Sequence, residues 1–240
     1  MKKLSIILLL FLPFSQPNDL NSTTLLQKMY ARYQGKWHSN LSFNQTTEMY
    51  KDDSLSKTQT WYEHILYPDM LRIDIGTPKS PNILIFRNDS TYVINNNKLT
   101  RSIKNENELI FFLGGLYFMP FDDVLAHFKV LNYDLSKFHT DIWKGKPVYV
   151  IGADKADEKV NQLWIDQEKL VAVRFLKYEN KNKEEGWFEA QIPLNHAWSE
   201  TKCTFFMNGH LIQVEKYHDV VAGGPIDKSM FEPGVADNKK

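Results

Sequence analysis

The spacing of apolar residues near the start of the chain predicts one amphipathic helix. Leu25, Met29 and Tyr33 recur at four-residue intervals within residues 22–33. Such spacing places the apolar side chains on one face of a helix. Asn21 or Ser22 is a suitable N-cap, and Gly35 follows the last apolar position as a stop signal.

From residue 37 onward the apolar residues alternate with polar ones, which is typical of strands. The alternating runs are rich in β-branched and aromatic residues, and short polar turns separate them. Asn208-Gly209, between two such runs, is the strongest hairpin signal. The predicted strands are residues 37–50, 58–66, 70–76, 82–87, 91–95, 98–103, 138–143, 147–152, 162–165, 170–178, 187–192, 202–207 and 210–217.

A second helical stretch interrupts these strands at residues 106–113 and 120–131. Gly114-Gly115 and Pro120 lie within its strongly aromatic segment, residues 111–121. A buried plug and a mobile lid both fit this composition. We therefore expect a mainly β fold with some α: an incomplete antiparallel β-barrel, or strongly curved sheet, with helices covering its concave face. Residues 16–240 contain no linker or repeat, so we expect a single domain.

The first residues have the pattern of an export signal. Lys2 and Lys3 precede an apolar run at residues 4–12, followed by Pro13 and the small residue Ser15. The run is shorter than the roughly 20 apolar residues that span a membrane. We predict a signal peptide at residues 1–15, with cleavage before Gln16.

Composition and motif content argue against several function classes. The chain has 29 basic and 29 acidic residues, and without Lys2 and Lys3 the counts become 27 and 29, a net charge of −2. The basic residues are scattered, so we expect no nucleic-acid partner. Cys203 is the single cysteine, and the seven histidines show no metal-ligand spacing. Motifs of serine hydrolases and nucleotide-binding enzymes are absent from the sequence, so we expect no cofactor, no metal and no enzymatic activity.

Two segments carry a resemblance to a known family. Residues 67–75 read YPDMLRIDI and are followed by ILI at 83–85 and NDSTYVI at 88–94; residues 145–151 read GKPVYVI and lead to WID at 164–166 and LVAVRF at 170–175. This sequence resembles the periplasmic outer-membrane lipoprotein carrier family (LolA/LolB-like). The resemblance implies a half β-barrel with an acyl-chain cavity, a periplasmic location and a lipid or lipoprotein acyl chain as ligand. It also implies inner- or outer-membrane lipoprotein-sorting components as partners, and we expect a monomer.

Two strands supply the predicted cavity wall. Leu71, Ile73 and Ile75 alternate with polar residues on one strand, and Val171, Val173 and Phe175 form a similar row on another, so each row is predicted to face one side of the sheet. The remaining predicted lining residues are Tyr92, Leu109, Phe112, Phe121 and Leu125. Each row also fits plain core. The alternative function is a non-enzymatic cell-envelope protein-interaction module on the same fold.

Overall fold

A computed structural model describes residues 20–234 of the chain. The predicted signal peptide and its cleavage position therefore lie outside the described residues. Within residues 20–234, no helix combines the length and the hydropathy that a membrane crossing requires.

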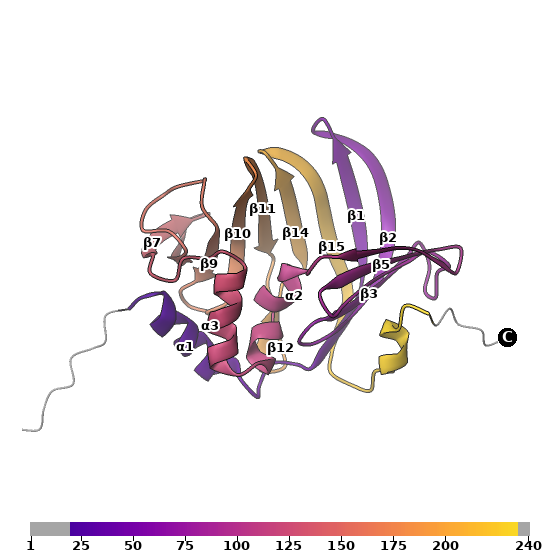
Figure 1. Cartoon of the computed structure of the whole chain (residues 1–240), viewed down its shortest axis with the longest axis horizontal. Coiled ribbons are helices and arrows are strands. Elements are labelled where there is room, and N and C mark those ends of the chain that lie inside the picture. The colour runs from indigo at the N-terminus through magenta and orange to yellow at the C-terminus, as the bar shows by residue number, and fades with distance from the viewer. Residues whose placement is uncertain (1–19, 235–240) are drawn as a thin grey trace, which may run out of the picture.

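One large antiparallel sheet dominates the described residues (Figure 1). Its strands are β1 (Asn40–Lys51), β2 (Ser54–Leu66), β3 (Met70–Ile75), β4 (Ile83–Arg87), β5 (Ser90–Asn95), β6 (Lys98–Lys104), β7 (Phe138–Trp143), β8 (Lys146–Ile151), β9 (Gln162–Asp166), β10 (Ala172–Glu179), β11 (Asn182–Glu189), β14 (Lys202–Met207) and β15 (His210–Ala222). Their order across the sheet is β6-β5-β4-β3-β2-β1-β15-β14-β11-β10-β9-β8-β7. The sheet is thus two meanders joined where β1 pairs with β15.

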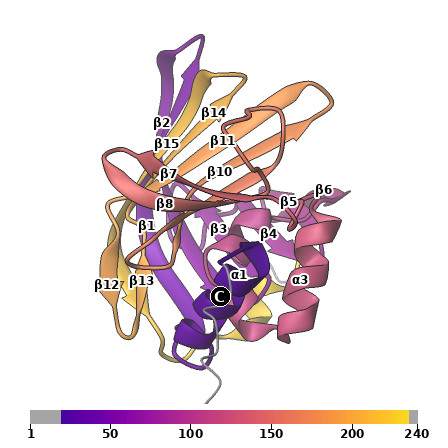
Figure 2. The same cartoon turned by 90° about the vertical axis from the view of Figure 1, so that its left-hand side faces the viewer.

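The sheet is strongly curved but is not closed into a barrel, because its outer strands β6 and β7 do not pair with each other. Figure 2 shows the curvature from the side, with the helices gathered on the concave face. The predicted fold class, an incomplete antiparallel barrel with helices covering its concave face, is confirmed.

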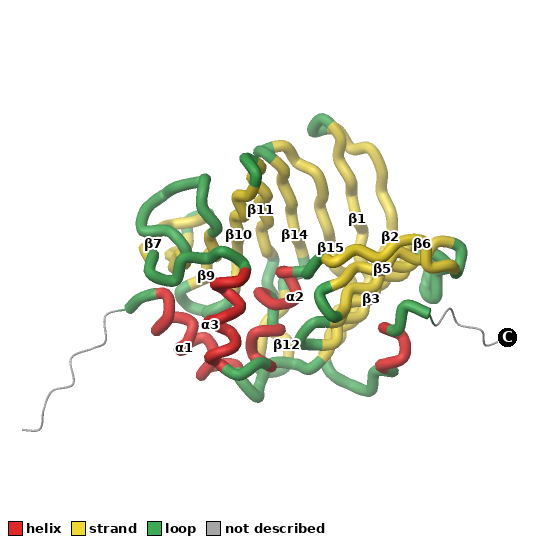
Figure 3. The backbone as a smooth tube through the Cα atoms, viewed as in Figure 1, coloured by secondary structure: helices red, strands yellow, loops and turns green. Residues whose placement is uncertain are grey.

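The helical elements are α1 (Ser22–Tyr33), α2 (Glu108–Phe112), the 3₁₀ helix η1 (Gly115–Phe118) and α3 (Phe121–Val130), shown in red in Figure 3. The first helix has the predicted bounds, and the Asn21 side chain caps it by accepting a 3.0 Å hydrogen bond from the backbone N–H of Thr24. Leu25, Leu26 and Phe128 are fully buried in the main core between the helices and the concave face.

The prediction was wrong for part of the second meander. Strand β11 begins at Asn182 rather than Trp187, and Asn180 and Lys181, both with positive φ, form the tight turn that joins it to β10. The adjacent acids Glu184 and Glu185 face opposite sides of this strand, so its first half shows no apolar alternation. Beyond β11, the predicted strand is replaced by a separate hairpin of β12 (Ile192–Leu194) and β13 (Ala197–Ser199).

A C-terminal segment covers the outer face of the first meander. It contains the 3₁₀ helix η2 (Lys228–Phe231), which contacts β3 and β4, and Phe231 is fully buried. Arg72 on β3 donates a 2.9 Å hydrogen bond to the carbonyl oxygen of Met230 and forms a buried bidentate ion pair with Asp74 at 2.9 and 3.0 Å. These polar residues of β3 therefore face η2 and point away from α1, α2 and α3.

Candidate functional site

A cavity of about 320 Å³ lies on the concave face, between the sheet and α2. This volume is at the lower end of the range for small-molecule sites, about 300–1,000 Å³. Strands from both meanders contribute to it, so it spans the β1–β15 pairing. The lining residues are Phe43, Trp61, Glu63, Ile65, Tyr67, Leu71, Ile73, Leu84, Phe86, Asn107, Leu109, Ile110, Leu113, Glu184, Glu200, Cys203, Phe205, Ile212, Gln213, Glu215 and Tyr217.

The apolar wall follows from strand alternation. Leu71 and Ile73 face the cavity. Arg72 and Asp74 occupy the alternate positions of the same strand, and they face the C-terminal segment. On the neighbouring strand β4, Leu84 pairs with Ile73 and Phe86 with Leu71, so four side chains form a continuous apolar surface. Leu71 and Ile73 therefore share the concave face, and a role for them in binding an acyl chain stays a prediction.

Helix α2 forms the opposite wall through Leu109, Ile110 and the following Leu113. Two glycines fix its position. A side chain at Gly114, whose φ is 151°, would collide with the Trp37 indole and the Tyr67 ring, and one at Gly115 would collide with the Pro68 carbonyl oxygen. The glycines thus permit close packing, and the wall is part of a packed segment in which Phe111, Phe112 and Tyr117 are buried. This arrangement favours the plug over the lid.

The remaining predicted lining residues do not line this cavity. Phe112, Val171 and Phe175 are buried in the main core, and Ile75, Phe121 and Leu125 are partly buried against the same core. Phe121, for example, packs on Tyr30 of α1 with ring centroids 5.3 Å apart. Of the predicted set, the structure brings only Leu71, Ile73 and Leu109 together at the cavity.

The expectation of a single row at Val171, Val173 and Phe175 was wrong. A β-bulge lies between Ala172 and Arg174 where β10 pairs with β9. Because a bulge adds one residue to a strand, it shifts the alternation by one position. Val173 consequently joins Val148, Val150 and Trp164 in a separate cluster on the outer face.

Tyr92 also lies on the outer face. It pairs with Ile85 across β4 and β5 and packs against a small cluster of Ile83, Ile85 and Ile94. The cavity-facing residues of β4 are the alternate ones, Leu84 and Phe86. Tyr92 was correctly predicted to lie in a strand. Its position in the alternation of that strand, however, places its side chain on the face of the sheet opposite the cavity.

Three buried glutamates form the floor of the cavity. Glu63, Glu200 and Glu215 are 6%, 8% and 9% exposed. The Glu215 carboxylate accepts hydrogen bonds from the Gln213 amide at 2.6 Å and the Tyr217 hydroxyl at 3.1 Å. No hydrogen bond or ion pair of the described residues reaches the side-chain carboxyl of Glu63, whereas the carboxyl of Glu200 accepts a hydrogen bond from its own backbone N–H, so the floor has an acceptor at Glu63 that is not saturated.

Burial raises the pKa of each floor carboxyl. The pKa of Glu63 lies well above its usual value because of burial and the nearby charges of Glu215 and Glu200. Burial and Glu215 together raise the pKa of Glu200 to about 7. Burial also raises the pKa of Glu215, although its hydrogen bonds from Gln213 and Tyr217 oppose this shift. The floor therefore holds protons at pH values where surface glutamates are ionised.

Trp61 adds an unsatisfied donor to the floor. It is 8% exposed, lines the cavity, and its indole N–H has no hydrogen-bond partner within residues 20–234. Trp61 and Glu63 are two positions apart on β2, so both project to the concave face about 7 Å from one another along the strand. The floor thus holds an unpaired donor and an unpaired acceptor at adjacent concave-facing positions of one strand.

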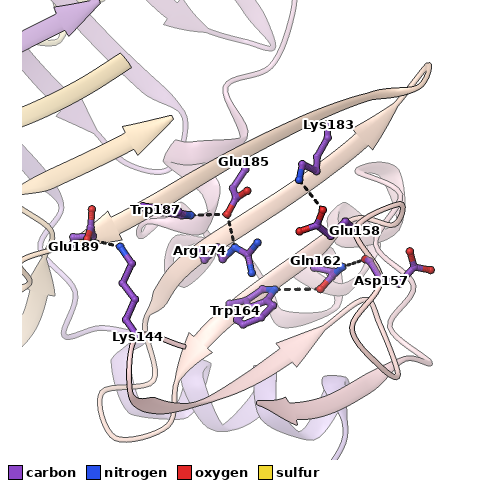
Figure 4. Close-up of polar contacts among 10 residues, drawn as sticks. All are labelled: Lys144, Asp157, Glu158, Gln162, Trp164, Arg174, Lys183, Glu185, Trp187 and Glu189. Atoms are coloured by element: carbon purple, nitrogen blue, oxygen red, sulfur yellow. Dashed lines mark hydrogen bonds and ion pairs between the residues drawn. The ribbon is translucent and has the colours of Figure 1, made fainter. Parts of the chain in front are cut away.

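Polar residues on the outer face of β9–β11 differ from the cavity floor because they are paired with one another. Figure 4 shows Arg174 with Glu185 at 2.7 Å, the Trp187 indole donating to Glu185 at 2.5 Å, and Lys144 with Glu189 at 2.6 Å. Salt bridges here neutralise each carboxylate locally. In contrast, no Lys, Arg or His side chain lines the cavity.

The sequence reasoning missed the glutamate floor. Glu63 lies between Trp61 and Ile65 at alternate positions of one strand, which is a visible signal that its side chain shares an apolar face. Glu215 similarly shares a row with Gln213 and Tyr217. Polar residues in strands are usually assigned to the solvent side. This signal can therefore be used only once it is known which alternate residues of each strand face the core.

The cavity also contains the thiol of Cys203. Burial raises the pKa of the Cys203 thiol well above its usual value, and its Sγ lies 3.3 Å from the Tyr217 hydroxyl, so the sulfur stays a protonated and weakly nucleophilic group. Across residues 20–234, no three His, Cys, Asp or Glu side chains are grouped to hold a metal ion. The groups present can solvate an apolar chain and hydrogen-bond a polar end.

Comparison with known proteins identifies the fold. No family model and no curated protein matches the sequence. Among solved structures, a DUF1329 family protein from Desulfovibrio piger has a TM-score of 0.61 at 14% sequence identity, with 88% of this chain and 95% of that chain covered. A putative outer membrane lipoprotein-sorting protein domain from Vibrio parahaemolyticus has a TM-score of 0.60 at 13% identity, covering 89% and 97%.

A LolA superfamily protein from Nitrosomonas europaea is similar over the same extent, with a TM-score of 0.58 at 10% identity and coverage of 89% and 98%. All three likenesses extend over nearly the whole length of the compared chains. The chain therefore has a LolA/LolB-like fold, which agrees with the resemblance carried by residues 67–94 and 145–175.

Proposed function

We propose that this chain is an exported carrier or chaperone of the periplasm that holds the acyl chain of a lipid or lipoprotein in its concave cavity. The observation that carries the proposal is an apolar-walled cavity of about 320 Å³ on a lipoprotein-sorting type of fold. Its role is binding without catalysis.

The walls supply the driving force for such binding. Leu71, Ile73 and Leu84 on the sheet side and Leu109 and Leu113 on the helix side present apolar surface from both directions. Each methylene group removed from water contributes about 0.8 kcal/mol. A chain of ten or so methylenes therefore offsets part of the entropy lost on association, which is several kcal/mol.

The test is to purify the exported protein under mild conditions and identify co-extracted molecules by mass spectrometry. We expect a molecule with an acyl chain at close to one per protein. In parallel, the delipidated protein is titrated with N-phenyl-1-naphthylamine, an uncharged apolar dye, whose fluorescence should rise and saturate.

The proposal is contradicted if the protein carries no acyl-bearing molecule and does not raise the fluorescence of the dye. That result would favour the alternative, a protein-interaction module of the cell envelope on the same fold. Dye displacement by acyl compounds connects the two measurements, because both ligands must then occupy the same cavity.

A further inference from the structure

The polar groups of the cavity floor lack the partners that buried polar groups normally have. The carboxyl of Glu63 receives no hydrogen bond from the described residues, and the indole N–H of Trp61 donates none. Gln45, fully buried on β1 directly opposite Trp61, also has a side-chain carbonyl oxygen without a partner. Trp61 and Glu63 lie on β2 and Gln45 on the neighbouring strand β1, so these groups gather on one face of the sheet beside the cavity.

The charge around the floor excludes one class of partner. Four of the lining residues are glutamates, namely Glu63, Glu184, Glu200 and Glu215, and none is basic. Lys177, whose charge acts on Glu184, is already paired with Glu108 of α2. A carboxylate or phosphate placed on the floor would therefore lose its hydration without gaining a counter-ion.

We propose that the floor recognises the uncharged polar end of an amphiphile, a hydroxyl or amide group, while the apolar walls hold its chain. This assignment rests on the proposed function and specifies its ligand class. A hydroxyl group donates to the Glu63 carboxyl and accepts from the Trp61 N–H, so it satisfies both groups at once. An ammonium group satisfies only the carboxyls, because it has no acceptor to offer the indole.

The experiment compares three ligands with the same chain and different polar ends: monododecanoylglycerol, dodecanoate and dodecylamine. Each displaces N-phenyl-1-naphthylamine from the delipidated protein at pH 7.5. We expect monododecanoylglycerol to bind most tightly. The affinity for dodecanoate should be lower by roughly tenfold or more, because its carboxylate has no donor to offer the buried acceptor on the floor.

Two substitutions test the contacts separately. Trp61→Phe keeps an aromatic ring, smaller than the indole, but removes the N–H, and it should weaken the binding of monododecanoylglycerol by roughly three- to tenfold. Glu63→Gln keeps a side-chain carbonyl oxygen and adds N–H donors at this position, and it should raise the affinity for dodecanoate. The control is Glu48→Gln, at a strand carboxylate paired with Lys216 on the outer face, which should change neither affinity. Cooperative melting of each variant establishes that it is folded.

The outcomes separate this inference from the proposed function. Equal binding of all three ligands, or tightest binding of dodecylamine, overturns the assignment of an uncharged polar end but leaves the acyl-chain carrier intact. Failure of every ligand to bind overturns both. Unchanged preferences in Trp61→Phe and in Glu63→Gln also overturn the inference, because the floor would then make no contact with the polar end.

Discussion

Phe175 on β10 lies directly opposite Gly186 on β11, and its ring occupies the space that a side chain at Gly186 would fill. The same ring stacks on Phe188 with centroids 5.9 Å apart. The glycine therefore allows a large aromatic side chain to lie flat on the concave face, where it supports the core beside the cavity.

Substituting Gly186→Ala should destabilise the protein by about 1–3 kcal/mol, since the added methyl group forces the Phe175 ring to move in a packed core. Chemical denaturation measures this change in unfolding free energy. In the background of Phe175→Leu the same alanine should cost much less. Equal costs in both backgrounds would show that the ring is not the group that excludes a side chain.

Ile73 tests the cavity wall. Ile73→Asp should abolish dye and acyl-chain binding while the protein still melts cooperatively, because the new carboxyl lies in an apolar wall opposite Glu63. Ile73→Ala should retain binding. The matched control is Ile142→Asp at an isoleucine that is 64% exposed, which should affect neither property. If Ile73→Asp unfolds the chain and Ile73→Ala binds normally, the residue is structural.

Glu200 should make stability depend on pH. Its pKa is raised to about 7 in the folded protein, so between its usual value near 4.5 and about 7 the folded state binds more protons than the unfolded state. Its contribution to stability is therefore present at low pH and is lost as pH rises through this window. Glu200→Gln should remove the dependence and stabilise the protein at pH 8 by up to about 3 kcal/mol.

His38 contributes with the opposite sign. Burial lowers its pKa to about 4, so the unfolded state takes up a proton below about pH 6.5 that the folded state excludes, and stability falls with falling pH. Glu200 must accordingly be measured as the difference between wild type and Glu200→Gln, by denaturation at pH 5, 6, 7 and 8. A difference that does not change over this range would contradict the raised pKa.

Removing one partner of the Arg72–Asp74 ion pair should lower the free energy of unfolding substantially. Both side chains are under 10% exposed, and Arg72 also holds the Met230 carbonyl oxygen. Arg72→Met should destabilise by about 3–5 kcal/mol because it leaves the Asp74 carboxylate buried and unpaired. The double variant Arg72→Met/Asp74→Leu should recover a large part of this loss. No recovery in the double variant would assign the loss to the Met230 contact.

Local signals were sufficient for much of the fold. The helix at residues 22–33 was correct in both bounds, because the Asn21 cap and the four-residue spacing agree. The first meander was predicted strand by strand, since alternation and turn residues coincide there. The β12–β13 hairpin was missed, as its three-residue strands are too short to show a period.

The candidate site was only partly predictable for a different reason. Leu71, Ile73 and Leu109 lie at the cavity because their own elements set their direction, and their role in binding stays a prediction. Val173 was misplaced by a bulge, which depends on pairing with β9 and leaves no mark in the strand's own residues. The glutamate floor arises from residues of separate strands, so it becomes visible only when the strand order is known.

The pairing of β1 with β15 also determines when the site comes into existence during biosynthesis. Leu41 pairs with Ala222, so the first strand of the sheet in the sequence can form this pairing only after the last strand has been synthesised. Contacts between such distant residues form late in folding, because the chain loses the entropy of closing the intervening loop before the contacts stabilise it. Trp61 and Glu63 come from one side of this seam and Glu215 and Tyr217 from the other. A nascent chain therefore lacks the assembled cavity until its final strand is available.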